Sequence, residues 1–449
     1  MLLEAGFLIK RFASERCPAQ GHCVKKSSAE MRNSMTDLQA MGERAVSAKY
    51  ALQKVSAQER DTTLREAAKL LSSQAPKILD ANEEDIRAAQ ESGMHPGMID
   101  RLRLTKERIE AMAEGLCQIA ELPHCVGEIM ERFERPNGLV IEKKRVPLGV
   151  IGIIYESRPN VTADAFGLCF KTGNAVILKG GSDALCSNIA IVEILRSALE
   201  QTGMPADALQ LIESTDRAAA AALMKMNGYV DVLIPRGGAG LIRNVVENST
   251  VPVIETGTGN CHVYVDKDAD LDMAVRIVVN AKTQRIGVCN ACESLVIHRD
   301  IEAAFLPRLA EALSPSRVEL RGDQAVREIL PDCTPASEED YGTEYLDYIL
   351  SLKTVDSVEE AIAHINKYNT KHSDCIVTQN KETGEKFLGE VDAACVYVNA
   401  STRFTDGFEF GFGAEIGIST QKLHARGPMG LRELTSYKYV IHGNGQIRG

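Results

Sequence analysis

The sequence contains no tryptophan, no second Cys-x-x-Cys pair, no cluster of histidines and no apolar run long enough to cross a lipid bilayer. Its 12 cysteines are scattered over 449 residues and lack the close spacing of a small disulfide-stapled domain. These absences argue against a membrane span, a secreted disulfide scaffold and a bound metal. They favour free thiols in a reducing compartment, so we expect a cytoplasmic protein.

Positive charge is also scarce. The chain has 51 basic against 62 acidic residues, a formal net charge of −11, which argues against a general binder of nucleic acids or anionic membranes. An anionic ligand would therefore need a local basic pocket. With 44% hydrophobic and 25% charged residues, the chain is long enough for two or three domains with large cores.

The N-terminal third is predicted to be helical. Residues 1–34 are expected to be a poorly structured extension, because an apolar start leads into charged residues without the cleavage site of a signal peptide. Residues 35–122 then show apolar side chains at helical spacing. After them, residues 133–146 predict a β-hairpin around the turn Arg135-Pro-Asn-Gly138. A hairpin that projects from the body is a natural oligomer contact.

The strongest chemical pattern lies between residues 280 and 293. Cys289 falls on a predicted loop between a helix and a strand, where catalytic groups are common. The nearby charges of Lys282 and Arg285 are expected to lower its pKa and favour the thiolate. Cys289 is therefore our candidate nucleophile, although a cysteine is also commonly a small buried side chain. Cys292 is interpreted as that kind of core residue.

From residue 149 onward the pattern alternates strands and helices, which predicts a doubly wound parallel sheet. Two predicted strands run into glycine turns before helices, at Lys179-Gly-Gly-Ser182 and at Arg236-Gly-Gly238. Free backbone amides at such turns suit phosphate, but glycine pairs also occur because turns need positive φ. Glu255 is predicted to end an apolar strand, where its carboxylate could reach a cleft and act as a base.

A series of short motifs follows in one order along the chain. They are Tyr155-Glu-Ser-Arg-Pro-Asn160, Leu178-Lys-Gly-Gly-Ser182, Pro235-Arg-Gly-Gly238, Glu255-Thr-Gly-Thr-Gly-Asn-Cys-His262, Asn280-Ala-Lys-Thr-Gln-Arg285, Val288-Cys-Asn290, His372-Ser-Asp374 and Asn399-Ala-Ser-Thr-Arg403. Together they resemble the gamma-glutamyl phosphate reductase family, a divergent branch of the aldehyde dehydrogenase superfamily. The resemblance extends from about residue 35 to the C-terminus, and the set is far more specific than any one motif.

The resemblance implies an α/β, aldehyde dehydrogenase-like fold with a Rossmann-like cofactor domain, an α/β catalytic domain and a small β oligomerisation element. We therefore expect residues 35–260 to form the cofactor-binding domain, with the hairpin 133–146 serving oligomerisation. Residues 261–400 would form the catalytic domain that carries the nucleophilic cysteine. Residues 401–449 would return to the cofactor domain and to the interface of a homo-oligomer, either a dimer or a tetramer.

The resemblance also implies an activity. It is the NADPH-dependent reduction of L-glutamyl 5-phosphate to L-glutamate 5-semialdehyde and phosphate, the second step of proline biosynthesis, with glutamate 5-kinase as the pathway neighbour. Cys289 matches the family's nucleophile, which would form a thioester that accepts hydride. Two alternatives remain: a phosphate-independent NAD(P)-dependent aldehyde dehydrogenase of the same superfamily, and a cofactor-binding scaffold without turnover.

The resemblance assigns further residues by position. Arg158, Arg285 and Arg403 are expected to bind the substrate's anionic groups, Asn290 to orient the nucleophile, and Glu255 matches the general base of aldehyde oxidisers. The superfamily's oxyanion-hole asparagine has no clear counterpart, so the second donor stays open. Ser182 replaces a glutamate that favours NAD, so NADPH/NADP+ is the expected cofactor. The residues expected to bind the cofactor are Lys179, Gly180, Gly181, Ser182, Arg236, Gly237 and Gly238.

Overall fold

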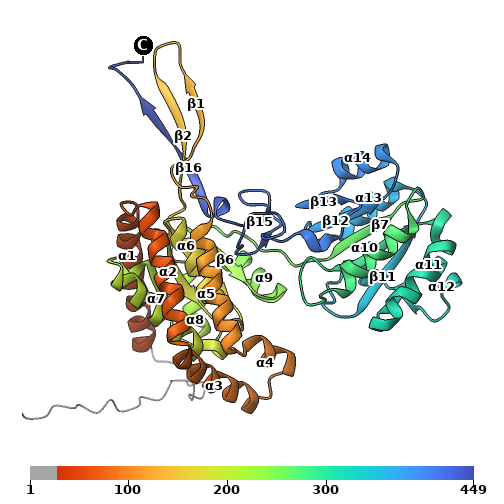
Figure 1. Ribbon diagram of the computed structural model, residues 1–449, viewed down its shortest axis with the longest axis horizontal. Coiled ribbons are helices and arrows are strands. Elements are labelled where there is room, and N and C mark those ends of the chain that lie inside the picture. The colour runs from red at the N-terminus through yellow and green to blue at the C-terminus, as the bar shows by residue number, and fades with distance from the viewer. Residues whose placement is uncertain (1–27, 449) are drawn as a thin grey trace, which may run out of the picture.

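The computed structural model describes residues 28–448, and it places side chains from residue 37 onward. Two lobes lie side by side, and a narrow β-arm projects from the first of them (Figure 1). Residues 1–27 of the predicted extension lie outside the described residues. The last part of that extension is helical, because α1 begins at Ser28.

Five helices form the N-terminal layer of the first lobe, as predicted. A capping box between Ser56 and Glu59 begins α2, and the Thr105 side chain caps α5. The four longer helices turn apolar residues toward the main core, whereas the short α4 contributes Leu102 to a separate small cluster. The helices are α1 (Ser28–Leu52), α2 (Ala57–Ser73), α3 (Ala75–Glu91), α4 (Pro96–Leu102) and α5 (Lys106–Glu121).

The first lobe is built on a parallel sheet with strand order β5-β4-β3-β6. Its central strands are fully buried, which explains their continuous apolar sequences. This sheet confirms the predicted alternation of strands and helices. Its elements are β3 (Val150–Tyr155), α6 (Asn160–Lys171), β4 (Ala175–Lys179), α7 (Leu185–Gln201), β5 (Leu209–Leu211), α8 (Arg217–Leu223), β6 (Val232–Arg236) and α9 (Ala239–Asn248).

The second lobe contains a seven-stranded parallel sheet with strand order β10-β9-β11-β8-β7-β12-β13. Its helices are α10 (Leu271–Thr283), α11 (Arg299–Leu313), α12 (Gln324–Ile329), α13 (Val358–Tyr368) and α14 (Lys381–Glu390). Its strands are β7 (Cys261–Val265), β8 (Cys292–His298), β9 (Glu319–Gly322), β10 (Thr334–Pro335), β11 (Ile349–Val355), β12 (Ser373–Val377) and β13 (Cys395–Val398).

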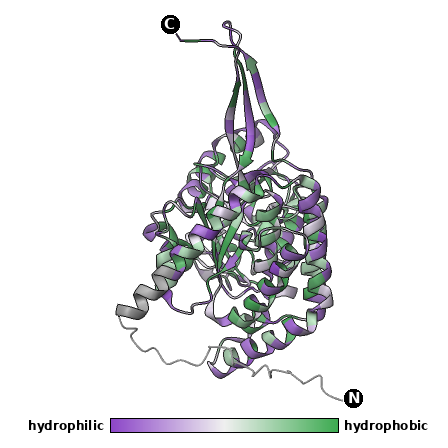
Figure 2. Cartoon of the chain, turned by 90° about the vertical axis from the view of Figure 1, so that its left-hand side faces the viewer, coloured by the Kyte–Doolittle hydropathy of each residue, from purple (hydrophilic) through white to green (hydrophobic). Residues whose placement is uncertain are grey.

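The arm is a three-stranded antiparallel sheet of β1 (Ile129–Glu134), β2 (Val140–Pro147) and β16 (Thr435–His442). The predicted turn joins β1 to β2, and Gly138 supplies its positive φ of 85°. The sequence of residues 434–442 predicts a final strand that pairs with this hairpin across a subunit interface. The strand and its partner are as predicted, but the placement across an interface is wrong. β16 pairs with β2 of the same chain along its whole length. Hydrophobic and hydrophilic residues mix along the arm (Figure 2).

The chain returns from the second lobe to the arm through an irregular segment, residues 399–434. It contains one short antiparallel pair, β14 (Ile418–Ser419) with β15 (Gly427–Pro428). Ser419 also bridges to Thr256, so this segment closes over the connection between the two lobes. No helix within residues 28–448 is long and apolar enough to cross a membrane.

Candidate active site

Cys289 lies on the loop between α10 and β8, as predicted. The two ends of this loop are tied together by a salt bridge between Lys282 and Glu293, whose Nζ and Oε2 atoms are 2.5 Å apart. Both side chains are completely buried, so the pair has no solvent screening. The loop therefore leaves and re-enters the core at one fixed point. Cys289 and Cys292 are both free thiols.

The environment of the thiol differs from our expectation. Burial raises the pKa of Cys289 to about 11, and the carboxylates of Glu344 and Glu415 also raise it. The charge of Arg236 gives the largest opposing electrostatic effect. The prediction that Lys282 and Arg285 lower this pKa is wrong, because desolvation outweighs the cations and Lys282 is paired with Glu293. Near neutral pH the group is a thiol.

Cys289 faces a cavity of about 300 Å³ lined by residues from both lobes. Seven other sequence-predicted residues line it: Arg158, Arg236, Gly237, Gly238, Arg285, Asn290 and Arg403. Five further charged residues line it that sequence reasoning did not assign: Arg101, Glu156, Glu344, Asp406 and Glu415. The predicted residues Glu255 and Lys179 to Ser182 are not among the lining residues.

Five arginines share this cavity, and none of them forms an ion pair with any residue of the described chain. The pKa of Arg158 is lowered by burial and by the neighbouring charges of Arg101, Arg236 and Arg285. Arginines that are crowded together without carboxylate partners form a site for an anion. The Arg403 Nε donates a hydrogen bond to the Gln284 side chain at 2.8 Å, which fixes its direction.

Asn290 acts on the backbone around the nucleophile. Its Nδ2 donates hydrogen bonds to the carbonyl oxygens of Arg403 at 3.3 Å and Thr405 at 2.9 Å. The Thr402 hydroxyl donates in return to the Asn290 carbonyl oxygen at 2.8 Å. These bonds join the Cys289 loop to the segment that carries Arg403, so Asn290 positions one substrate-side arginine relative to the thiol.

Gly259 allows the chain to pass directly against the backbone of Cys289. A Cβ atom at Gly259 would overlap the carbonyl oxygen of Cys289. The Gly259 amide donates to the Glu344 side chain at 2.6 Å. Glycine is therefore required at this position by close approach and not by a turn.

Glu255 is not brought to the nucleophile. Residues 253–256 form only isolated bridges and no regular strand, which corrects the predicted strand end. The backbone amide of Glu255 donates to the Gln421 side chain at 3.2 Å. Four carboxylates do line the Cys289 cavity: Glu156 directly follows β3, whereas Glu344, Asp406 and Glu415 come from irregular segments with no periodic pattern to reveal them.

The predicted cofactor residues lie at the carboxyl ends of β4 and β6, the two parallel strands that flank β3. Gly238 caps α9, and its amide donates to the Glu156 carboxylate at 2.8 Å, so this helix start already accepts an anion. A Cβ at Gly237 would overlap the same carboxylate. Lys179 ends β4, and its Nζ donates to the Gly180 carbonyl oxygen at 2.7 Å. Burial lowers the pKa of Lys179.

The turn after β4 continues through residues 181–183. Gly181 precedes Ser182, which is exposed and begins a short 3-10 turn (Ser182–Ala184). The nearest carboxylate, Asp183, accepts a hydrogen bond from the Ser157 hydroxyl. The charge of Asp183 also acts on Lys179, where it opposes the effect of burial on the pKa of that amine.

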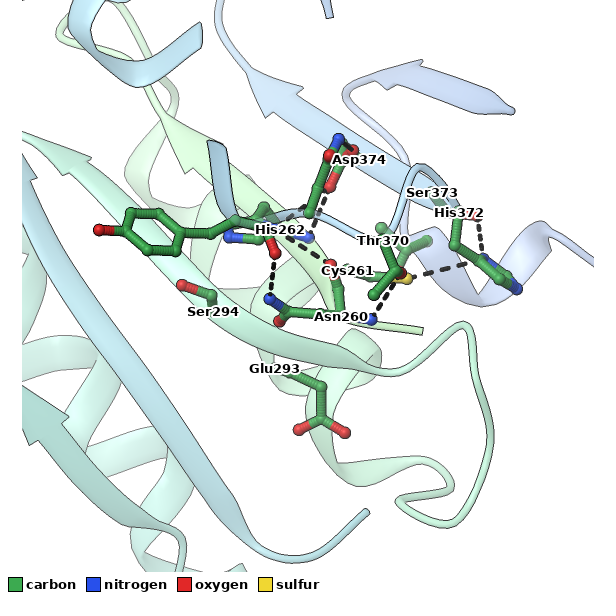
Figure 3. Close-up of polar contacts among 12 residues, drawn as sticks. Asn260, Cys261, His262, Glu293, Ser294, Thr370, His372, Ser373 and Asp374 are labelled. Carbon is green, nitrogen blue, oxygen red and sulfur yellow. Dashed lines mark hydrogen bonds and ion pairs between the residues drawn. The ribbon is translucent and has the colours of Figure 1, made fainter. Parts of the chain in front are cut away.

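A row of buried polar residues crosses the second sheet in register: Asp374 on β12, His262 on β7, Ser294 on β8 and Ser351 on β11. All four are completely buried. The His262 amide donates to Asp374 at 2.9 Å, and its ring meets the Asn260 carbonyl oxygen at 3.1 Å (Figure 3). The row lies at the starts of the strands, beside the Cys289 loop.

The comparisons with known proteins agree with this geometry. The model of the aldehyde dehydrogenase family matches residues 10–328 and 329–440. The chain belongs to this family. The gamma-glutamyl phosphate reductase of Lachnospira eligens is 60% identical over 414 residues, which cover 92% of this chain and 100% of the relative. That of Carboxydothermus hydrogenoformans is 57% identical over 415 residues, with 92% and 100% coverage.

Solved structures place the chain in the same branch of the family. The crystal structure of the gamma-glutamyl phosphate reductase of Thermotoga maritima superposes with a TM-score of 0.90 at 48% identity, covering 92% of this chain and 100% of that one. An acetylating aldehyde dehydrogenase of Geobacillus thermoglucosidasius shares the fold, with a TM-score of 0.67 at 18% identity and coverage of 93% and 99%. The resemblance and the predicted fold class are confirmed.

Proposed function

We propose that this chain reduces L-glutamyl 5-phosphate to L-glutamate 5-semialdehyde and phosphate with NADPH, as the second step of proline biosynthesis. The observation that carries the proposal is the single cavity that combines the Cys289 thiol with five unpaired arginines. The names of relatives at 57–60% identity support the same activity. Glutamate 5-kinase would supply the acyl phosphate.

The chemistry follows from the residues of the cavity. The Cys289 sulfur attacks the C5 carbonyl carbon, forming a C–S bond while the C5–O bond to phosphate breaks. The thiol proton passes to the departing phosphate, which leaves as hydrogen phosphate toward Arg158, Arg285 and Arg403. When bound, NADPH would supply the hydride for the thioester carbon. The C–S bond then breaks, which releases the aldehyde, and the Cys289 sulfur regains a proton from solvent. Lys179 and the turns at 180–182 and 236–238 would hold NADPH.

The test is the reverse reaction, followed as NADPH formation from glutamate 5-semialdehyde, inorganic phosphate and NADP+. We expect phosphate-dependent activity that falls at least about 10³-fold in Cys289→Ser, with NAD+ a poorer substrate than NADP+. Activity that persists without phosphate would instead indicate an aldehyde oxidiser. Tight NADPH binding without turnover of the semialdehyde would indicate a scaffold.

The arm supports a homo-oligomer. Its strands expose large apolar side chains, including Ile129 at 43%, Tyr439 at 55% and Ile441 at 58%. An exposed apolar edge of this kind is a contact surface for another chain. We expect light scattering after gel filtration to give a dimer or tetramer, and Tyr439→Lys/Ile441→Lys to lower the mass. An unchanged mass would exclude the arm as the contact.

A further inference from the structure

Glu415 lies where two cavities meet. It lines the Cys289 cavity and an adjoining cavity of about 690 Å³ that contains neither Cys289 nor the glycines of the α9 turn. Arg158 and Arg285 also line both cavities. Glu415 is therefore on the side of the nucleophile that leads away from the predicted cofactor turn.

Four carboxylates line the Cys289 cavity, and each accepts a backbone hydrogen bond; that of Glu415 comes from Gly407, and Glu415 differs from the others in one buried oxygen. Glu156 accepts from the Gly238 amide, Glu344 from the Gly259 amide, and Asp406 from the amide of Phe408. The Oε2 atom of Glu415 is buried and has no hydrogen-bond partner among the described residues. A buried acceptor without a partner costs free energy, so its retention points to a partner that arrives from outside the chain.

Electrostatics around Glu415 agree with a missing cation. Burial raises its pKa to about 7, the charge of Asp406 raises it further and that of Arg236 lowers it. Yet the guanidinium of Arg236 is not within ion-pair distance of it, and neither is that of any other arginine of the cavity. The cavity thus combines five arginines that can bind an anion with one carboxylate, Glu415, that has no ion-pair partner among the described residues and one oxygen without a hydrogen bond.

The substrate of the proposed function, on which this inference rests, carries one such cation. The α-carbon that carries this ammonium is three carbon–carbon bonds from the carbon that Cys289 attacks, a span of about 4 Å, and the nitrogen is one bond further. We infer that Glu415 binds the α-ammonium group of the substrate and thereby restricts the enzyme to acyl phosphates of α-amino acids.

The discriminating experiment uses two aldehydes in the reverse reaction with NADP+ and inorganic phosphate. One is glutamate 5-semialdehyde, and the other is 5-oxopentanoate, which has the same carbon chain and carboxylate but no amino group. In Glu415→Gln, we expect kcat/KM for the semialdehyde to fall about 10- to 100-fold through KM, since a charge-assisted hydrogen bond is lost. With 5-oxopentanoate it should stay within about threefold of wild type.

The matched control is Glu409→Gln, an exposed carboxylate on the same segment that lines neither cavity. It should leave both aldehydes unaffected, while Glu415→Asp should restore part of the preference. The inference is overturned if Glu415→Gln slows both aldehydes equally or leaves their ratio unchanged. A wild-type enzyme without phosphate-dependent turnover of the semialdehyde would instead refute the proposed function.

Discussion

The two parallel sheets of this protein differ in where their polar residues lie. In the first sheet, β3 and β4 are apolar until their last residues, Tyr155 and Lys179, and polar groups appear where the strands end. In the second sheet, polar residues are buried within the strands at matched positions, beginning with His262 and Asp374. One sheet offers backbone turns at its edge, and the other holds a catalytic loop from below.

This difference predicts how each sheet responds to substitution. An apolar sheet whose binding groups are backbone amides should lose stability before it loses activity. A sheet whose buried polar residues hold the nucleophile's loop should lose both together, because unpaired buried groups shift the loop.

The largest expected effect is in the second sheet. Lys282→Met leaves Glu293 buried without its cation, and we expect the free energy of unfolding in urea to fall by about 3–5 kcal/mol. The double variant Lys282→Met/Glu293→Leu should recover most of this loss. If Lys282→Met were as stable as wild type, the proposed difference between the two sheets would be contradicted.

The loss of stability in Lys282→Met should depend on pH. Burial already raises the pKa of Glu293 to about 7, above its unfolded value, despite Lys282. A raised carboxyl pKa means that the folded state holds the proton more tightly, so its unfavourable contribution is small at low pH and grows as pH rises through 7. The deficit of Lys282→Met should therefore be larger at pH 8 than at pH 6. A deficit that shrinks with rising pH would contradict this assignment.

A similar loss of stability in the first sheet should leave the chemistry intact. Ile177 is completely buried in β4, and Ile177→Ala should lower the unfolding free energy by about 3 kcal/mol. The value of kcat per folded molecule should stay within about twofold of wild type. A tenfold fall in kcat would mean that the two sheets do not differ as described.

The next largest effect is expected at Gly259, which packs against the backbone of Cys289. In Gly259→Ala the new methyl group would displace the Cys289 carbonyl, and we expect kcat/KM to fall about 100-fold. Gly240→Ala on α9, where a Cβ meets nothing within 4 Å, is the matched control. If the two variants were equally active in steady-state assays, activity would not depend on a fixed position of the Cys289 loop.

The smallest effect concerns the thiol. With a pKa of about 11, Cys289 gains thiolate as pH rises, so its alkylation by iodoacetamide should quicken about tenfold per pH unit between pH 7 and 9. Arg236→Gln removes the largest opposing charge and should slow alkylation at each pH. A rate that levels off near pH 7 would show a lower pKa.

Much of this architecture could be predicted from sequence. The buried runs of β3 and β4, the loop position of Cys289 and the arm hairpin all depend on local patterns, and each is present. The sign of the Cys289 pKa shift could not be predicted, because a count of nearby charges does not show burial. Arg101 and Glu415 reach the cavity only through the packing of distant segments. The hairpin was correctly predicted as the partner of β16, but a strand pattern does not specify whether that hairpin belongs to the same chain or to another subunit.

The central claim is that Cys289 carries the substrate as a thioester between the arginines and the cofactor. Mixing the enzyme with glutamate 5-semialdehyde and NADP+ in the absence of phosphate tests it most directly, with NADPH measured by stopped flow. We predict a burst of about one NADPH per active site, then a slow phase that inorganic phosphate accelerates, and no burst in Cys289→Ser. Sustained turnover without phosphate, or a burst that survives in Cys289→Ser, would contradict the account.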